Sequence, residues 1–203
     1  IIASSNKGKI SEFQRILPHF ECIPQSAFNI CDVEETGKDF EENAILKAKN
    51  AFLKTNIPCI GDDSGLIIPA INNEPGLYSA RYAGVDATDS DNRNKLISKL
   101  KDGKLESTYA YFFCCIIAIG IKSQNRIIVC TGKVEGEVRT IERGKKGFGY
   151  DPMFYPRGYS KSFAELNSLE KNKISHRGVA LKKLMKELNK TCLLYTSPSP
   201  RDA

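Results

Sequence analysis

The chain has 203 residues, of which 41% are hydrophobic and 27% charged, and it carries a formal net charge of +6. This composition is sufficient for one globular domain with a substantial core and excludes a chain that is disordered throughout. Since no run approaches the roughly 18 apolar residues that a membrane span needs, we expect no membrane partner.

The first predicted elements form a strand, loop and helix unit. The residues "IIAS" predict the end of a first strand, and the loop "SSNKGK" follows it. Apolar residues at helical spacing then predict a helix over 10–17, and "FECIPQ" predicts a second strand. The segment 35–54 predicts a long helix with one apolar stripe, in which Thr36 and Asp39 have the spacing of a capping box.

The remaining predicted elements are strands over about 57–61 and 65–70, a helix over 88–101, paired long strands over 106–121 and 126–135, and a last helix over 168–189. Helices separated by strand pairs indicate an α/β domain with a mixed sheet rather than a strict parallel alternation. Past Thr191 the composition changes to Pro, Ser and Thr. We therefore predict a single domain over 1–190 and a disordered or foreign tail over 191–203.

Seven cysteines are present, and they lack both paired CxxC spacing and the density of a disulfide scaffold. We expect reduced thiols and a cytoplasmic protein. Cys114 and Cys115 lie in the apolar run "YAYFFCCIIAIGI", where free cysteine acts as a small hydrophobic residue.

Charge is unevenly distributed along the chain. Between Asp32 and Glu42 there are six acidic residues and a single lysine, whereas between Arg143 and Lys190 twelve Lys or Arg face four Asp or Glu. Such an asymmetry is typical of two solvated faces, or of a cation site and a polyanion site that folding brings together.

The hexapeptide "GDDSGL" places two carboxylates between hydrophobic stretches. Adjacent residues of an extended chain point to opposite faces, so Asp62 and Asp63 cannot both face water at the end of a buried strand. One of them is expected to face a site. The alternative is a simple turn, which Asp, Ser and Gly all suit.

Three further segments can carry chemistry, although each has a plain structural alternative. "SSNKGK" stands before a helix, where backbone N–H groups favour an anion, but a solvated loop fits it equally. "GFGYDP" can bring backbone close to a flat ligand and stack a ring on it, or can be a tight turn. "EKNKISHRG" supplies Lys171, His176 and Arg177, or forms a solvated basic helix.

Together these segments suit a nucleotide whose phosphates meet Lys and Arg and whose base meets an aromatic ring. Magnesium prefers one or two carboxylates plus phosphate oxygens of a substrate, and "GDDSGL" can supply those carboxylates.

In their order along the chain, "SSNKGKISEF", "EETGKDFEENAILKA", "DDSGL", "PGLYSARYAG", "GFGYDPMF" and "ISHRGVAL" resemble the inosine triphosphate pyrophosphatase family over nearly the whole chain to about residue 190. The resemblance implies a long mixed β-sheet with flanking helices that form two lobes around a central cleft. It also implies a homodimer, and hydrolysis of the triphosphates of inosine, deoxyinosine and xanthosine (ITP, dITP and XTP) to the monophosphate and pyrophosphate with Mg²⁺.

The resemblance also assigns roles to individual residues. Asp63 would accept a proton and, with Glu34, bind the metal. The residues that would bind the nucleotide are Ser4, Ser5, Asn6, Lys7, Gly8, Lys9, Ser64, Phe148, Gly149, Tyr150, Asp151, Lys171, His176 and Arg177. Phe148 would stack on the purine. For Asp62, which lies on the other side of the strand end from Asp63, we expect instead a neighbouring backbone group or a second metal as partner.

Two other classes of function compete with this hypothesis. A nucleic-acid-binding module would use the basic C-terminal third for phosphate contacts, but it would leave the paired aspartates without a role. Another metal-dependent phosphohydrolase would also use carboxylates and magnesium, but it would release orthophosphate rather than pyrophosphate. We therefore expect a small nucleotide as the partner and no nucleic acid.

Overall fold

The structure is a computed structural model and describes residues 1–121 and 126–192. In this part of the chain five strands form a sheet of order β2-β1-β3-β4-β5, with antiparallel pairing throughout. The strands are β1 (Cys59–Ile68), β2 (Glu74–Pro75), β3 (Ser107–Ile119), β4 (Ile127–Arg139) and β5 (Phe154–Pro156). Ile2 adds isolated parallel bridges to Pro24 and Ile60, so the N-terminal segment continues the sheet beside β1.

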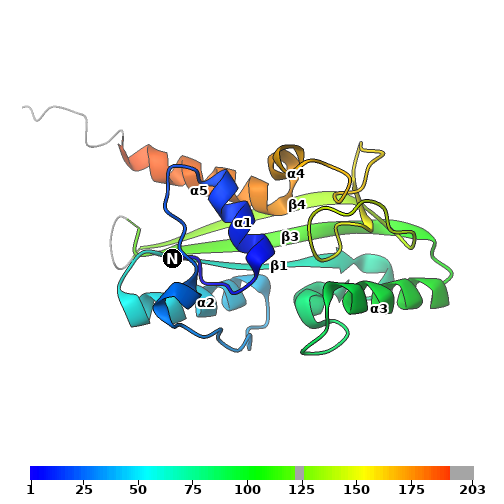
Figure 1. Cartoon of the computed structure of the whole chain (residues 1–203), viewed down its shortest axis with the longest axis horizontal. Coiled ribbons are helices and arrows are strands. Elements are labelled where there is room, and N and C mark those ends of the chain that lie inside the picture. Colours follow the sequence, from blue (N-terminus) through cyan, green and yellow to red (C-terminus); the bar gives the residue numbers. More distant parts are fainter. Residues whose placement is uncertain (122–125, 193–203) are drawn as a thin grey trace, which may run out of the picture.

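The helices surround the long strands. They are α1 (Lys7–Ile16), α2 (Phe40–Thr55), α3 (Asp89–Asp102), α4 (Ser168–Ile174) and α5 (His176–Cys192), with short 3₁₀ turns at Gln25–Phe28, Pro69–Ile71 and Gly76–Arg81. In Figure 1, α1, α4 and α5 lie above the long strands and α2 and α3 below them.

The alternating side chains of β3 build two cores. Cys114 and Ile116 pack with Leu181 and Leu184 of α5 on one face, whereas Cys115, Ile117 and Ile119 pack with Ala44 and Ala48 of α2 on the other. Both cysteines are fully buried, which confirms that they are core residues. This period of two is what an extended strand buried on both faces requires.

A third core lies around the start of β3. Leu96 and Leu100 of α3 pack there with Phe112, Phe154 and Phe163, and the two pairs Phe112–Phe154 and Phe154–Phe163 have ring centroids 4.8 and 5.1 Å apart. The long strands therefore join two separately packed regions. One contains α1, α2 and α5, and the other contains α3 and the segment 140–166.

The structure corrects the predicted strands around the paired aspartates. Instead of two strands flanking a turn, β1 runs unbroken through Asp62 and Asp63, which pair with Ile116 and Cys115 of β3. The turn hypothesis fails because cations from other elements neutralise both side chains, so the strand can bury them. The expected second strand at 20–25 is also absent, apart from the bridge at Pro24.

Two helix boundaries differ from those predicted. The long helix begins at Phe40, and its cap is Asp39, whose carboxylate accepts a hydrogen bond of 2.8 Å from the Glu42 N–H. The predicted last helix is two helices, because the backbone of Ser175 is extended, with ψ of 155°. Because of this break, Lys171 lies on α4 and Arg177 lies on α5.

The boundary of the tail is only partly described. Helix α5 continues through Cys192, and residues 193–203 lie outside the described part of the chain, so the predicted division at 190 stays a prediction. None of the described helices is long and apolar enough to cross a membrane.

Candidate active site

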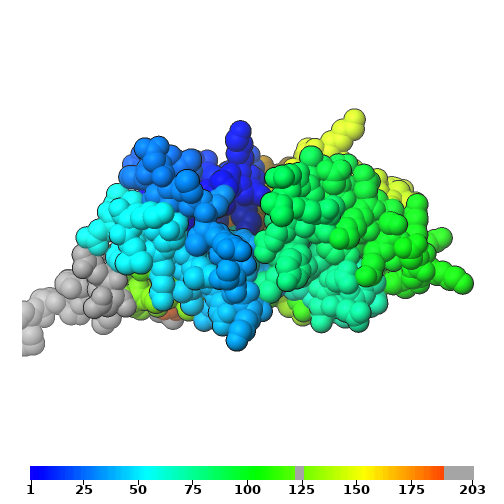
Figure 2. Space-filling model, turned by 90° about the horizontal axis from the view of Figure 1, so that it is seen from below, coloured from blue at the N-terminus to red at the C-terminus, as the bar shows by residue number. Residues whose placement is uncertain are grey.

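A cavity of about 280 Å³ lies between the two packed regions. Figure 2 shows a hollow on this face, between the N-terminal segment in blue and the segment that contains α3 in green. Most of the predicted site residues line it: Asn6, Lys9, Asp63, Ser64, Phe148, Gly149, Tyr150, Asp151, Lys171, His176 and Arg177. Segments separated by more than 100 residues therefore meet at one site.

The other predicted residues lie outside this cavity. Ser5 and Lys7 are exposed, and the Ser5 hydroxyl donates to Asp32. Ser4 accepts a hydrogen bond from the Asn6 N–H, at 3.1 Å. Gly8 lies against the Phe148 ring. Glycine at this position leaves space for the Phe148 ring, since a Cβ there would be 2.6 Å from that ring.

Glu34, which was predicted to bind a metal together with Asp63, stays a prediction. It is exposed and does not line the cavity, whereas the next residue, Glu35, does. The carboxylate of Glu35 binds Lys47 and Arg81. Of the two adjacent glutamates, Glu35 is therefore the one that the fold directs into the site.

Asp63 projects from β1 toward α2. Its carboxylate lies 2.8 Å from the Lys47 Nζ and 3.3 Å from the Asn43 amide nitrogen. Burial raises the pKa of the Asp63 carboxyl above its ordinary value, although Lys47 opposes this effect. A carboxylate that is largely removed from water and open to a cavity has the environment of a general base.

Asp62 projects from the opposite face of β1. Its carboxylate lies 2.6 Å from the Lys9 Nζ and 3.0 Å from the Arg177 Nε. Burial would raise its pKa, but the two cations hold that pKa well below the ordinary range. The sequence-based expectation of a backbone partner or a second metal for Asp62 is therefore wrong, because two cations occupy its oxygens.

Lys171 and Arg177 share a further carboxylate that sequence analysis missed. Glu12 of α1 lies 2.8 Å from the Lys171 Nζ and also binds Arg177. Lys171 in turn lies 2.5 Å from Asp151. Lys9, Arg177 and Lys171 thus alternate with three carboxylates in one continuous ionic network along the wall of the cavity, and all of these residues except Lys9 are buried.

The loop 147–152 is held by a hydrogen bond within the loop and by two hydrogen bonds to α3. The Asp151 carboxylate accepts a hydrogen bond of 2.9 Å from the Phe148 N–H. From α3, Asp89 accepts a hydrogen bond from the Gly149 N–H at 2.6 Å, and Arg93 donates one to the Gly149 carbonyl at 2.9 Å. Since Gly149 has a φ of +60°, glycine is the residue that this conformation favours.

Aromatic rings form the wall for a flat ligand. The Phe148 ring lies between Gly8 of α1 and the Lys171 ammonium, which is 4.8 Å from the ring centroid. Deeper in the cavity, His176 stacks on Phe112 with ring centroids 4.7 Å apart. Burial and Arg177 hold the pKa of His176 well below its ordinary value, so His176 is neutral. Its Nδ1 has no protein partner among the described residues.

Glu35, Lys47 and Glu12 are the site residues that sequence reasoning missed. Lys47 lies one residue before Ala48 of the buried alanine stripe, so its position on α2 places it beside the sheet. Glu12 precedes the buried Phe13 on α1. A charged residue next to a buried stripe is a weak signal, because the same pattern is common at the edge of any amphipathic helix.

The carboxylates of the cavity are the candidate ligands for a metal ion. No group of three or more His, Cys, Asp or Glu side chains in the described ranges is arranged to hold a metal ion. Asp63 and Glu35 nevertheless line one cavity and share the Lys47 ammonium. Magnesium prefers one or two carboxylates together with substrate phosphate and water, but at Glu35 it would have to replace the cations Lys47 and Arg81, which bind both carboxylate oxygens.

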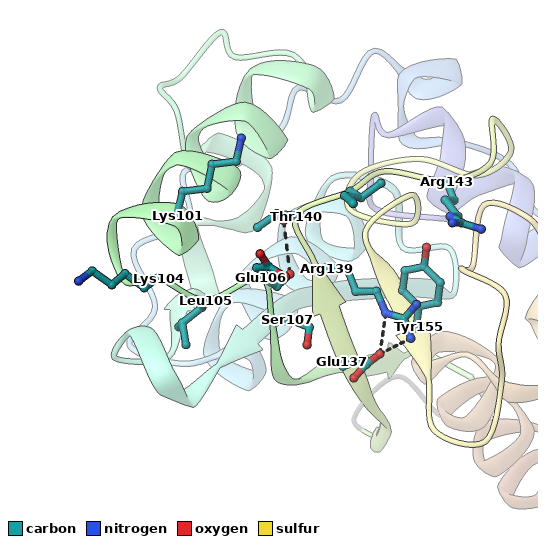
Figure 3. A pocket seen from close by; sticks show the side chains of 11 residues that line it. Lys101, Lys104, Leu105, Glu106, Ser107, Glu137, Arg139, Thr140, Arg143 and Tyr155 are labelled. Atoms are coloured by element: carbon teal, nitrogen blue, oxygen red, sulfur yellow. Dashed lines mark hydrogen bonds and ion pairs between the residues drawn. The ribbon is translucent and has the colours of Figure 1, made fainter.

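A larger cavity of about 620 Å³ lies elsewhere, between the end of α3 and the end of β4. Figure 3 shows Lys101, Lys104 and Arg143 around it, with Arg139 paired to Glu137 above Tyr155. It contains none of the predicted site residues. The candidate site is therefore the smaller cavity, where buried charges converge.

Comparison with known proteins agrees with this geometry. The model of the Ham1 family matches residues 1–187. A dITP/XTP pyrophosphatase of Legionella pneumophila (strain Lens) is 47% identical over 184 residues, which cover 91% of this chain and 95% of that protein. Two solved Ham1 proteins are also similar in structure. The one from Coxiella burnetii has a TM-score of 0.83 at 42% identity over 93% of this chain and 97% of its own. The one from Staphylococcus aureus has a TM-score of 0.81 at 43% identity over 94% and 97%.

Proposed function

Because the chain belongs to the Ham1 family, we propose that it hydrolyses dITP, ITP and XTP to the nucleoside monophosphate and pyrophosphate. It is a hydrolase that acts on phosphoric anhydrides. The observation that carries this proposal is the cavity in which Asp63 faces an aromatic wall and a row of buried cations.

The triphosphate would bind at the start of α1. The first turn of this helix has free N–H groups, apart from that of Lys9, which the Asn6 side chain caps at 3.0 Å. These groups and the helix dipole favour an anion. Lys9 adds a positive charge, and its ammonium is positioned by the Asp62 carboxylate, which lies 2.6 Å from the Lys9 Nζ. Charge neutralisation is the main requirement of phosphoryl transfer, since the reaction needs little covalent chemistry from the protein.

Asp63 would act as the general base. The attacking water gives its proton to the Asp63 carboxylate, and the raised pKa of this group brings its basicity closer to that of an effective acceptor. Lys47 lies between Asp63 and Glu35 and holds the two carboxylates in one geometry. Mg²⁺ would be bound by Asp63 and phosphate oxygens of the substrate, with Glu34 or its neighbour Glu35 as the second carboxylate, and it would neutralise the charge that builds up on the phosphates.

The base would lie against Phe148, near Lys171, His176 and Arg177. Lys and Arg are hydrogen-bond donors only, so they pair with a 6-keto oxygen and leave a 6-amino group unpaired. An unpaired buried polar group costs roughly 1–3 kcal/mol, which corresponds to about 5- to 150-fold discrimination against adenine.

The rival functions fit the site less well. A nucleic-acid-binding module needs cations along an open surface, whereas Lys171 and Arg177 are buried and already paired with carboxylates. A phosphomonoesterase needs no binding wall for a purine, and Phe148 would then have no role.

Two further properties belong to the proposal. A homodimer is supported by exposed aromatic residues outside the site, among them Tyr78 and Tyr109, which are 63% and 46% exposed. Sedimentation at micromolar concentration should then give twice the chain mass, and a monomer would contradict it. A cytoplasmic location is supported by the free thiols of all cysteines whose side chains are described.

Product analysis tests the proposed reaction directly. With dITP and magnesium the expected products are dIMP and pyrophosphate, and kcat/KM for dITP should exceed that for dATP by more than about tenfold. Orthophosphate as the first product would contradict the proposed bond cleavage. Equal rates with dITP and dATP would contradict the readout of the 6-keto group.

A further inference from the structure

Glu12 is buried in α1 but does not line the cavity that would bind the nucleotide. Its side chain is 6% exposed, and its two oxygens bind Lys171 of α4 and Arg177 of α5. Those two cations do line the cavity. Glu12 can therefore influence a bound nucleotide only through them.

The break at Ser175 explains why such a link is needed. Because α4 ends and α5 begins there, the rigid backbone of a single helix does not fix the spacing between Lys171 and Arg177. Glu12 binds one cation with each oxygen and so bridges the two helices. The opposite sides of the same cations are held by Asp151 and Asp62, at 2.5 and 3.0 Å.

Glu12 is also linked to the wall of the cavity that would hold the base. It lies one helical turn after Gly8, and the Phe148 ring rests on Gly8. Both cations lie near this ring, with the Lys171 Nζ 4.8 Å and the Arg177 Cζ 5.9 Å from its centroid. One turn of α1 thus positions the aromatic wall through Gly8 and the donors through Glu12.

We propose that Glu12 is a positioning residue for purine selection, which fixes the distance between the donors Lys171 and Arg177 and so sets the preference for 6-keto over 6-amino bases. This proposal rests on the proposed function. Without this carboxylate, Asp151 and Asp62 would still pair with one cation each, but no negative charge would bridge Lys171 and Arg177. Their mutual repulsion would then move the donors away from the edge of the base.

Glu12→Gln tests the proposal, because it keeps the size of the side chain and removes its charge. The readout is the ratio of kcat/KM for dITP to kcat/KM for dATP, with KM and kcat measured separately. We expect this ratio to fall at least about tenfold, mainly through a higher KM for dITP, since the donors act in binding rather than in proton transfer. Glu12→Asp keeps the charge and should recover part of the ratio.

Leu184→Ala is the matched control. Leu184 is fully buried on α5 in the core that α5 shares with α1, and it carries no charge that could pair with the ionic network. This variant should lower the melting temperature without changing the dITP to dATP ratio, and so it separates loss of stability from loss of selectivity.

The outcomes are distinguishable. A wild-type ratio in Glu12→Gln overturns the role of Glu12, even if the variant is less stable. If Glu12→Gln does not fold, the ratio of Glu12→Asp decides, and a wild-type value overturns the proposal. If the wild-type enzyme itself does not prefer dITP, the proposed function fails before the role of Glu12 is tested.

Discussion

Asp62 and Asp63 are neighbours in β1, yet their carboxylates lie on opposite faces of the sheet and bind different cations. Asp62 binds Lys9 and Arg177, at 2.6 and 3.0 Å, and Asp63 binds Lys47 at 2.8 Å. Because successive side chains of a strand point to opposite faces, the two neighbouring aspartates can have different roles. Asp62 orders the cations of the site, while Asp63 remains available to the cavity.

For Asp63→Asn we expect a large loss of turnover with the fold retained. The amide keeps the shape of the side chain but cannot accept a proton, so the rate of pyrophosphate release should fall by roughly 10²–10⁴. Thermal melting should show a folded protein. Near-native turnover at saturating magnesium would exclude Asp63 as the base.

Asp62→Asn should instead reduce stability. The substitution leaves Lys9 and Arg177 without the buried carboxylate that they share. Removing one partner of a buried ion pair typically costs about 3–5 kcal/mol. Urea unfolding measures the loss. A stability within about 0.5 kcal/mol of wild type would mean that the network is not buried as described.

Gly8→Ala should separate activity from stability. Alanine favours a helix by roughly 0.5–1 kcal/mol over glycine, but its Cβ would lie 2.6 Å from the Phe148 ring and displace it. We expect unchanged or higher stability and a kcat/KM for dITP that is lower by about tenfold.

Gly103→Ala serves as the control for this variant. Gly103 follows α3, and a Cβ there would meet its nearest neighbour at 3.5 Å, so neither activity nor folding should change much. Full activity of Gly8→Ala would argue against a defined position of the Phe148 ring.

The stabilising contribution of Glu12 should be lost in acid. Burial opposes ionisation, but Arg177 and Lys171 lower the pKa of Glu12 from 4.5 to about 2. A carboxyl whose pKa is depressed by folding stabilises the protein above the unfolded pKa, and this contribution is lost as the pH falls from 4.5 toward 2. The loss approaches about 3 kcal/mol.

The comparison of wild type with Glu12→Gln isolates this contribution. Since glutamine does not titrate, the unfolding free energy of the variant should fall less steeply with acid over the same pH range. Parallel curves for the two proteins would contradict the depressed pKa.

Local pattern predicted much of this fold. The apolar stripe of α2, the long strands β3 and β4 and the helix α3 follow from periodicity, and the predicted stripe residues Ala44, Ala48 and Ala51 are fully buried. The unbroken course of β1 did not follow from local pattern, because a strand tolerates two adjacent aspartates only when distant cations reach both faces. Those cations come from α1, α2 and α5, and no local signal shows this.

The candidate site was predictable in part for the same reason. Phe148, Lys171 and Arg177 belong to motifs that are unusual in themselves, and the fold brings them together. Glu12, Glu35 and Lys47 have no such motif. Their positions depend on which side of a helix meets the sheet, and a shift of one residue separates the exposed Glu34 from Glu35, which lines the cavity.

The attachment of Gly149 to α3 has a consequence for motion. Because Asp89 and Arg93 bind both the N–H and the carbonyl of Gly149, we expect the loop 147–152 to move together with α3. Across the cleft, the Phe148 ring contacts Gly8 by van der Waals packing, and Asp151 of the same loop forms an ion pair with Lys171 of α4. If the cleft opens to release a monophosphate and the ring moves away together with α3, this ion pair should break in the same step.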